Sequence, residues 1–125
     1  MSQTHKERVV ILGASDKPER YSHRAMKMLR EHGHEIVLVH PRLAEIEGHP
    51  VLNDLSAIRG AVDTVTMYVG PEASSAVAGE LIALRPRRVI FNPGSENPAL
   101  QARLADAGVQ VEEACTLVLL STGQF

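Results

Sequence analysis

Residues 9–15 read Val9-Val10-Ile11-Leu12-Gly13-Ala14-Ser15, and they carry the clearest fold signal in the chain. A short run of apolar, mostly β-branched residues that ends at a glycine is typical of a strand buried on both faces of a parallel sheet. The glycine suits a tight turn that carries backbone N–H groups towards an anion. The stretch therefore predicts a central strand with a candidate binding loop at its carboxyl end.

The same pattern recurs along the chain, and segments with helical spacing lie between the apolar runs. This alternation predicts an α/β fold: a Rossmann-like doubly wound parallel sheet of about five strands, with helices on both faces. We expect a single domain over residues 1–125. The further predicted strands are Ile36–Val39, Val62–Val69, Arg88–Phe91 and, at a sheet edge, Val109–Val111.

The helical patterns are bounded by glycine, proline and asparagine at the positions where these residues start or stop helices. The segment 42–53 is the least regular, because Gly48 and Pro50 interrupt it. The predicted helices are Tyr21–His32 before Gly33, Ala73–Leu84 after Pro71, a helix between Asn97-Pro98 and Gly108, a short helix or turn near Leu55–Ile58, and a closing helix within Cys115–Leu120.

Composition narrows the class of ligand. The 125 residues carry 13 Lys and Arg against 15 Asp and Glu, and the pI is about 6.3, which argues against a nucleic-acid-binding chain. No apolar run is long enough for a membrane span, and two Tyr, two Phe and no Trp leave little surface for base stacking. One cysteine cannot form an internal disulfide. We expect a cytoplasmic protein that binds a small molecule, with no nucleic-acid or membrane partner.

Ligands of open α/β sheets bind outside the carboxyl ends of the strands, where the winding reverses. The residues that follow the predicted strands therefore form one candidate rim. It consists of Gly13-Ala14-Ser15, His40-Pro41-Arg42, Val69-Gly70-Pro71 and Asn92-Pro93-Gly94.

The first two corners restrict the ligand. Ser15 and Pro18 stand where a dinucleotide fingerprint has its second and third glycines, and the phosphate-binding loop motif of NTPases is absent. The second strand ends without the carboxylate that holds an NAD ribose, and Arg42 suits a phosphorylated ribose instead. This leaves NADP, or coenzyme A with its 3′-phosphate.

Other basic residues fall into two groups. Lys17 and Arg20 lie in the first loop, from which they can reach a phosphate, whereas Arg24 is expected to face solvent. Three arginines cluster at the opposite, amino edge of the sheet, where we expect a solvated face. They are Arg85, Arg87 and Arg88.

The sequence shows no catalytic constellation and no metal site. The six histidines lack the spacing of metal ligands, and Ser15 has no base within its motif. Cys115 follows Glu112-Glu113, whose charges disfavour a thiolate, so we expect a buried structural cysteine. We therefore lean towards a protein that is not an enzyme.

These loops match a known pattern. The chain from about Arg8 to Phe125 resembles small stand-alone CoA-binding proteins, which are similar to the N-terminal CoA-binding domain of the succinyl-CoA synthetase α subunit and of NDP-forming acyl-CoA synthetases. The matching residues are Gly13-Ala14-Ser15 with Lys17, Pro18 and Arg20-Tyr21-Ser22, then Val39-His40-Pro41, then Asn92-Pro93-Gly94-Ser95-Glu96-Asn97.

The resemblance implies a Rossmann-like domain that holds CoA across the strand ends. The chain departs from many relatives at His40, where they have Asn, and at residues 92–94, where others are rich in Gln; the later domain with the ligases' phosphorylated histidine is not in this sequence. The resemblance would place Gly13, Ala14 and Ser15 along the pyrophosphate and ribose; Lys17, Arg20, Tyr21 and Ser22 around the phosphates; His40, Pro41 and Arg42 near the adenosine; Val69, Gly70 and Pro71 beside the adenine or pantetheine; and Asn92, Pro93 and Gly94 along the pantetheine.

Three functions stay open at this point. The first is a protein that binds CoA or an acyl-CoA without catalysis of its own. The second is a small NADP-dependent oxidoreductase, for which Tyr21, Tyr68 and His40 are the candidate proton donors. The third is a nucleotide-sensing regulatory or interaction module, and a homodimer or a protein partner also stays open.

Overall fold

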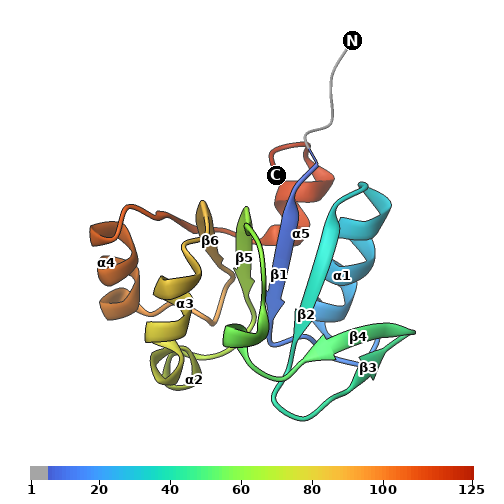
Figure 1. Cartoon of the computed structure of the whole chain (residues 1–125). Coiled ribbons are helices and arrows are strands. Elements are labelled where there is room, and N and C mark those ends of the chain that lie inside the picture. Colours follow the sequence, from blue (N-terminus) through green and yellow to red (C-terminus); the bar gives the residue numbers. More distant parts are fainter. Residues whose placement is uncertain (1–5) are drawn as a thin grey trace.

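The computed structural model describes residues 6–125, which form a seven-stranded sheet between two layers of helices (Figure 1). Neighbouring strands are parallel except for one antiparallel pair at the edge, β3 with β4. The strand order is β3-β4-β2-β1-β5-β6-β7. The strands are β1 (Arg8–Leu12), β2 (Glu35–Val39), β3 (Glu45–Ile46), β4 (His49–Leu52), β5 (Thr64–Met67), β6 (Arg88–Phe91) and β7 (Gln110–Glu113).

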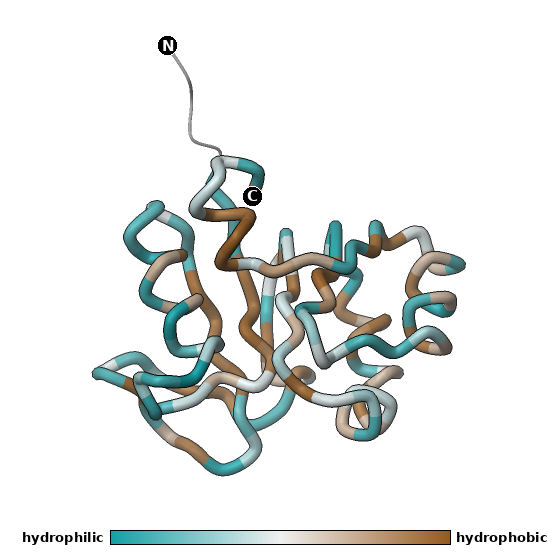
Figure 2. The backbone as a smooth tube through the Cα atoms, turned by 180° about the vertical axis from the view of Figure 1, so that it is seen from behind, coloured by the Kyte–Doolittle hydropathy of each residue, from teal (hydrophilic) through white to brown (hydrophobic). Residues whose placement is uncertain are grey.

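Helices cover both faces of the sheet, as the sequence predicts for a doubly wound fold. They are α1 (Tyr21–Glu31), the 3₁₀ helix η1 (Leu55–Ala57), α2 (Pro71–Ala76), α3 (Ala78–Leu84), α4 (Pro98–Asp106) and α5 (Thr116–Ser121). Apolar side chains of α1 and α5 pack on one face of the central strands, and those of η1, α3 and α4 pack on the other. Figure 2 shows the hydrophobic strands enclosed between these two layers.

The strand count is the main correction to the prediction. The five predicted strands correspond to β1, β2, β5, β6 and β7, but the irregular segment 42–53 folds as a hairpin and adds β3 and β4. Its two turn residues, Glu47 and Gly48, have φ of 49° and 83°, as a tight two-residue hairpin requires. Pro50 is compatible with this short strand pair at the edge of the sheet.

Side chains of α1 hold the tip of this hairpin. His23 Nε2 lies 2.8 Å from Glu47 Oε2, at an angle that does not make a good hydrogen bond, and Lys27 Nζ lies 3.8 Å from Glu47 Oε1. The hairpin therefore stays close to the helix that starts beside the first loop.

A second correction concerns the helix predicted over residues 73–84. It begins at Pro71 and is divided at Val77, whose φ of −111° and ψ of 15° separate α2 from α3. The predicted capping residues elsewhere are confirmed. Asn97 Oδ1 accepts a hydrogen bond from Leu100 N at 3.2 Å, and Gly33, with φ of 85°, follows the end of α1.

The strand order shows where the winding of the sheet reverses. From β1 the chain winds outwards to β2 and β4, and then crosses back to β5 on the other side of β1. The winding thus reverses between β1 and β5, and ligands of open α/β sheets bind at the carboxyl ends of such strands. Within residues 6–125, no helix is both long and apolar enough to cross a membrane.

Candidate functional site

A cavity of about 530 Å³ lies at the carboxyl ends of β1, β2 and β5, where the winding reverses. Its wall comes from the loop after β1, the first residues of α1, the turn after β2 and the end of β5. The lining residues are Gly13, Ala14, Ser15, Asp16, Lys17, Arg20, Tyr21, Ser22, His40, Pro41, Leu43, Tyr68 and Val69.

Gly13 is required by the packing of the strand ends. Its φ is +95°, and a Cβ at this position would lie 2.7 Å from the carbonyl oxygen of Tyr68. The N–H groups of Gly13 and Ala14 both donate to the carbonyl of Val39 at 3.1 Å. The N–H groups of these two residues are therefore occupied by β2 and are not free for an anion, whereas an anion contact from the rest of the turn stays a prediction.

The amino end of α1 provides donors to the cavity instead. No side chain of the described residues caps this helix, which has no acidic residue in its first turn. Tyr21 and Ser22, its first two residues, line the cavity. Free N–H groups and the helix dipole favour an anion at such an end. Lys17 and Arg20 line the same cavity and add positive charge.

A second cavity of about 240 Å³ adjoins the first, on the face of the sheet covered by α2 and α3. The two cavities share Gly13, Pro41 and Val69, so together they form one site across the switch point. The wall of the second cavity is mostly apolar, with polar groups at its edge. The other lining residues are Leu12, Val39, Asn53, Asp54, Leu55, Ala73, Val77 and Glu80.

The structure brings ten of the predicted site residues together around the first cavity: Gly13, Ala14, Ser15, Lys17, Arg20, Tyr21, Ser22, His40, Pro41 and Val69. The other six line neither of these two cavities, and their contact with a ligand stays a prediction: Arg42, Gly70, Pro71, Asn92, Pro93 and Gly94.

Asn92 has a clear structural task. Its Nδ2 donates to Thr66 Oγ1 at 2.7 Å and to the carbonyl of Met67 at 2.8 Å, while its Oδ1 accepts from Thr116 N at 2.8 Å. The buried side chain thus ties the end of β6 to β5 and to the start of α5.

Sequence reasoning missed Asp16 and Leu43 in the first cavity, and it considered Tyr68 only as a candidate proton donor and not as part of the rim. Asp16 lies inside the quoted loop motif and Tyr68 directly precedes the third corner, so their position beside predicted site residues was the signal that could have identified them. Burial raises the pKa of Tyr68 to about 12, although the nearby hydroxyls of Thr116 and Thr66 partly oppose the rise. The phenol is therefore protonated at neutral pH, and its oxygen is buried without a hydrogen-bond partner.

Cys115 is less buried than predicted. It is half-buried and directly precedes α5.

The amino edge of the sheet also differs from the prediction, because Arg88 is only 5% exposed. Its Nε donates to Thr64 Oγ1 at 2.8 Å, and its terminal nitrogens reach Glu112 Oε2 at 3.2 Å, Glu7 Oε2 at 3.4 Å and the carbonyl of Phe125 at 2.8 Å. The guanidinium also lies over the Phe125 ring, 4.4 Å from its centroid. Arg88 is thus a buried structural cation and not part of a solvated face.

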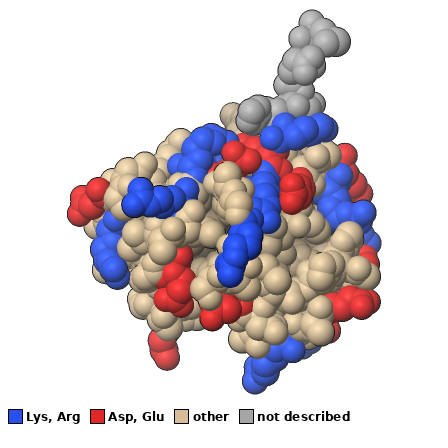
Figure 3. Space-filling view, in the orientation of Figure 1, with Lys and Arg blue, Asp and Glu red and all other residues tan. Residues whose placement is uncertain are grey.

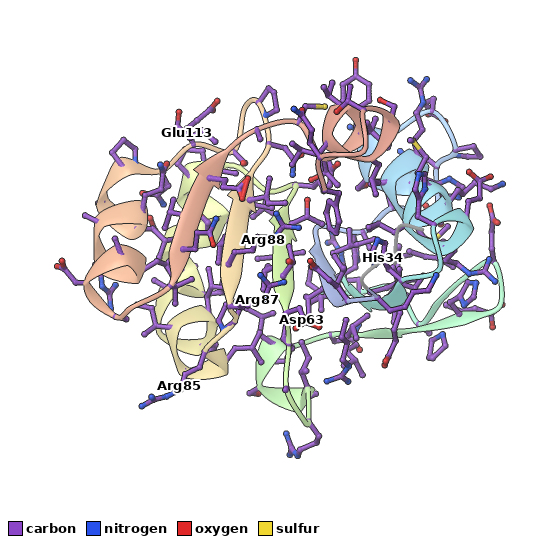
Figure 4. The ribbon with its side chains drawn as sticks, turned by 90° about the horizontal axis from the view of Figure 1, so that it is seen from above. His34, Asp63, Arg85, Arg87, Arg88 and Glu113 are labelled. Atoms are coloured by element: carbon purple, nitrogen blue, oxygen red, sulfur yellow. The ribbon has the colours of Figure 1, made fainter. Side chains whose placement is uncertain are left out.

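Its two neighbours in sequence stay in contact with water. Arg87, whose side chain is 51% exposed, donates to Glu7 Oε2 at 2.9 Å and lies 3.9 Å from Asp63 Oδ1. Figure 4 looks onto this edge and shows Arg87, Arg88 and Asp63 close together, with Arg85 directed away from them. Basic and acidic side chains also alternate along the upper edge in Figure 3.

Among the described residues, no three His, Cys, Asp or Glu side chains gather in a way that could hold a metal ion.

Known proteins share the fold of this chain. A crystal structure of an uncharacterized protein is 39% identical, with a TM-score of 0.91 over 97% of this chain and 99% of that one. A Thermus thermophilus structure, cell-free ID.343, is 29% identical, with a TM-score of 0.86 over 96% of this chain and 91% of that one. Uncharacterized protein YneT of Bacillus subtilis (strain 168) is 33% identical over 76 residues, which span 61% of this chain and 56% of YneT.

A larger enzyme shares the fold. A dinucleotide-forming acetyl-coenzyme A synthetase of Ca. Korarchaeum cryptofilum matches 84% of this chain and 25% of its own, at 16% identity and a TM-score of 0.73. The family model of the CoA binding domain matches residues 7–121. This match covers most of the sequence and all seven strands, and the chain therefore belongs to the CoA binding domain family.

Proposed function

We propose that this protein binds coenzyme A or an acyl-CoA across the carboxyl ends of β1, β2 and β5, without catalysis of its own. The observation that carries the proposal is the uncapped amino end of α1, which borders the larger cavity together with Lys17 and Arg20. Membership of the CoA binding domain family supports coenzyme A as the ligand.

The larger cavity suits the phosphates of CoA. The first N–H groups of α1 are free to bind phosphate oxygens, which is how helix ends recognise anions. Ser15 Oγ accepts a hydrogen bond from Lys17 N at 3.1 Å and so shapes the loop that carries the lysine. Lys17 and Arg20 are exposed and have no ion-pair partner among the described residues, so their charge is available to a ligand.

The smaller cavity suits the adenine. A nucleobase has apolar faces and polar edges, and this cavity combines apolar walls with Asn53 and Asp54 at its rim. Because both cavities include Gly13, Pro41 and Val69, one ligand can extend from one cavity into the other.

The candidate proton donors support a binding protein over an NADP-dependent enzyme. The hydroxyl of Tyr68 is buried beneath the cavity surface. Tyr21 is 65% exposed, and the guanidinium of Arg24 lies 5.5 Å from its ring centroid. His40 Nδ1 already accepts two backbone N–H groups. Within residues 6–125, none of the three side chains forms a hydrogen bond with a carboxylate or another titratable side chain that could resupply the proton.

Calorimetric titration at fixed salt tests the proposal, with CoA, acetyl-CoA, 3′-dephospho-CoA, NADP and NAD as ligands. We expect CoA and acetyl-CoA to bind, and NADP and NAD to bind much more weakly or not at all. Lys17→Ala should weaken CoA binding, while Arg30→Ala, at the far end of α1, should not. NADP binding without a CoA response, or equal effects of the two substitutions, would overturn the assignment.

A further inference from the structure

The ring of His40 is held in one orientation by its own turn. His40 directly follows β2, is half-buried and lines the larger cavity. The backbone N–H groups of Arg42 and Leu43 donate to its Nδ1 at 3.0 Å and 3.1 Å. A nitrogen that accepts two N–H groups cannot carry a proton, so the proton of the neutral ring is on Nε2.

Asn53 fixes the same turn from the other side. Its Nδ2 donates to the carbonyls of His40 at 2.8 Å and of Leu43 at 2.9 Å, and His40 N donates to the carbonyl of Leu52 at 3.0 Å. The hairpin strand β4 therefore holds the backbone on which the imidazole stands. A ring held in this way loses little further conformational entropy when it binds a ligand.

The other ring nitrogen is free. No atom of residues 6–125 forms a hydrogen bond with His40 Nε2, and this nitrogen is accessible to solvent. Since His40 lies in the cavity wall, its Nε2–H is a neutral donor that is available to a bound molecule.

We propose that His40 determines specificity by donating from Nε2 to the 3′-phosphate of the CoA-type ligand. This inference rests on the proposed function and names one contact within that site. In doubly wound domains the end of the second strand meets the ribose of the nucleotide, where a carboxylate binds a free hydroxyl. Here the same place offers an N–H donor, which suits phosphate oxygens and offers no acceptor to a free hydroxyl.

This assignment differs from the one that the sequence suggests. Arg42 is the obvious phosphate ligand in the sequence, but it is exposed and lines neither of the two cavities of the site. Its charge acts from the rim and is screened by salt. The uncharged His40 donor acts at the cavity wall and does not require an imidazolium.

The tautomer can be measured without any ligand. A long-range ¹H–¹⁵N correlation spectrum near neutral pH should show His40 with a protonated Nε2 and an unprotonated Nδ1. His40→Asn assigns the signal, because it is the one that disappears. A protonated Nδ1, or rapid exchange between the two tautomers, would overturn the inference whatever the protein binds.

The contact is tested with CoA and 3′-dephospho-CoA. His40→Asn keeps an acceptor oxygen for the turn N–H groups and removes the donor at the position of Nε2, because the shorter Asn side chain holds its amide N–H groups nearer the backbone. We expect it to lower CoA affinity about tenfold, in line with a hydrogen bond to a charged group, and to leave 3′-dephospho-CoA affinity nearly unchanged. Thermal unfolding confirms that the variant folds.

Arg42→Ala is the matched control. It should cost CoA affinity less than His40→Asn does, and its effect should disappear as salt is raised. Equal losses for both ligands in His40→Asn, or no loss at all, would overturn the phosphate contact while leaving the proposed function intact. Failure of the unaltered protein to bind CoA would overturn the proposed function itself and the contact with it, whereas the tautomer measurement would still stand.

Discussion

The two edges of the sheet carry the same kinds of side chain and use them in opposite ways. At the amino edge, Arg88 is buried and contacts Thr64, Glu112, Glu7 and the carbonyl of Phe125. At the carboxyl edge, Lys17 and Arg20 are exposed around a cavity. An arginine whose three guanidinium nitrogens all donate to the protein stabilises the fold, whereas a cation without a partner is available to a ligand. The two edges therefore differ in whether their cationic side chains already have partners within the protein, and not in the type of residue.

This difference predicts that the two edges respond to different measurements. Substitutions at the amino edge should change the free energy of unfolding, and substitutions at the carboxyl edge should change ligand affinity. The predictions below test that separation.

The largest effect is expected from Arg88→Met. It leaves the buried carboxylate of Glu7 without one of its cations, and breaking a buried ion pair from one side costs about 3–5 kcal/mol. Urea unfolding should show a loss of about this size, while Arg85→Met, at an exposed position, should change stability by about 0.5 kcal/mol or less. A loss below about 1 kcal/mol for Arg88→Met would contradict the structural role of Arg88.

The next effect is expected from Gly13→Ala. Gly13 lies at the carboxyl edge, but we expect its substitution to change stability because a Cβ there does not fit the packing of the strand ends. The new Cβ would lie 2.7 Å from the Tyr68 carbonyl oxygen, at a φ of +95°. We expect a loss of about 2–4 kcal/mol in urea unfolding. Gly94→Ala is the matched control, since Gly94 has φ of +93° and a Cβ added there would meet no atom within 4 Å, and it should cost about 1 kcal/mol. Equal losses would show that the backbone angle alone matters.

A smaller effect, on affinity alone, is expected from Arg20→Ala. Arg20 lines the cavity, whereas Arg24, one turn later, is exposed and lies over the Tyr21 ring. Arg20→Ala should weaken CoA binding by about five- to tenfold, with a smaller dependence on salt, and Arg24→Ala by about twofold at most. Both variants should unfold at the same urea concentration as the unaltered protein. A loss of stability in Arg20→Ala would contradict the prediction that substitutions at the carboxyl edge change affinity alone.

The smallest effect is a pH dependence at the amino edge. Burial lowers the pKa of His34 from its usual 6.5, although the charge of Glu7 opposes the shift, and His34 Nδ1 accepts a hydrogen bond from Glu7 N at 3.0 Å. Because the folded-state pKa is depressed, the unfolded chain binds the proton more readily. The stability that His34 contributes is thus present above pH 6.5 and is lost as pH falls through and below that value.

Unfolding at about pH 7.5 and about pH 5.5 measures this contribution. His34→Asn keeps an acceptor for Glu7 N and removes the titration, so it should lose less stability between the two pH values than the unaltered protein does. Identical losses would assign the pH dependence to other groups.

Much of the fold could be predicted because its signals are local. The apolar run Val9–Leu12, the stop at Gly33 and the cap at Asn97 each act within a few residues, and the structure confirms them. The hairpin β3–β4 could not be predicted in the same way. Its strands are two and four residues long, and β4 is stabilised by pairing with β2, which no local pattern records.

The candidate site was predicted in outline for the same reason. Strand order follows from general rules, so the corners after β1, β2 and β5 could be placed on one rim, and the cavity lies there. The roles of single residues within the rim depended on contacts between distant segments. Val39 occupies the N–H groups of Gly13 and Ala14, and Asn92 is engaged by Thr66 and Thr116.

Local patterns were enough to predict the class of fold, the edge of the sheet at which we propose that a ligand binds, and the family, because apolar periodicity, turn residues and a loop motif are properties of neighbouring positions. Which polar groups already have hydrogen-bond partners depended on contacts that form only in the folded chain. The prediction that Arg88 lies on a solvated face was wrong because Glu7, Thr64 and Glu112 contact it from other strands and from the segment before β1. His40 acquired a defined donor because the turn after β2 closes on its ring. Hydrogen-bond partners come from segments far apart in the chain, so only folding could assign them.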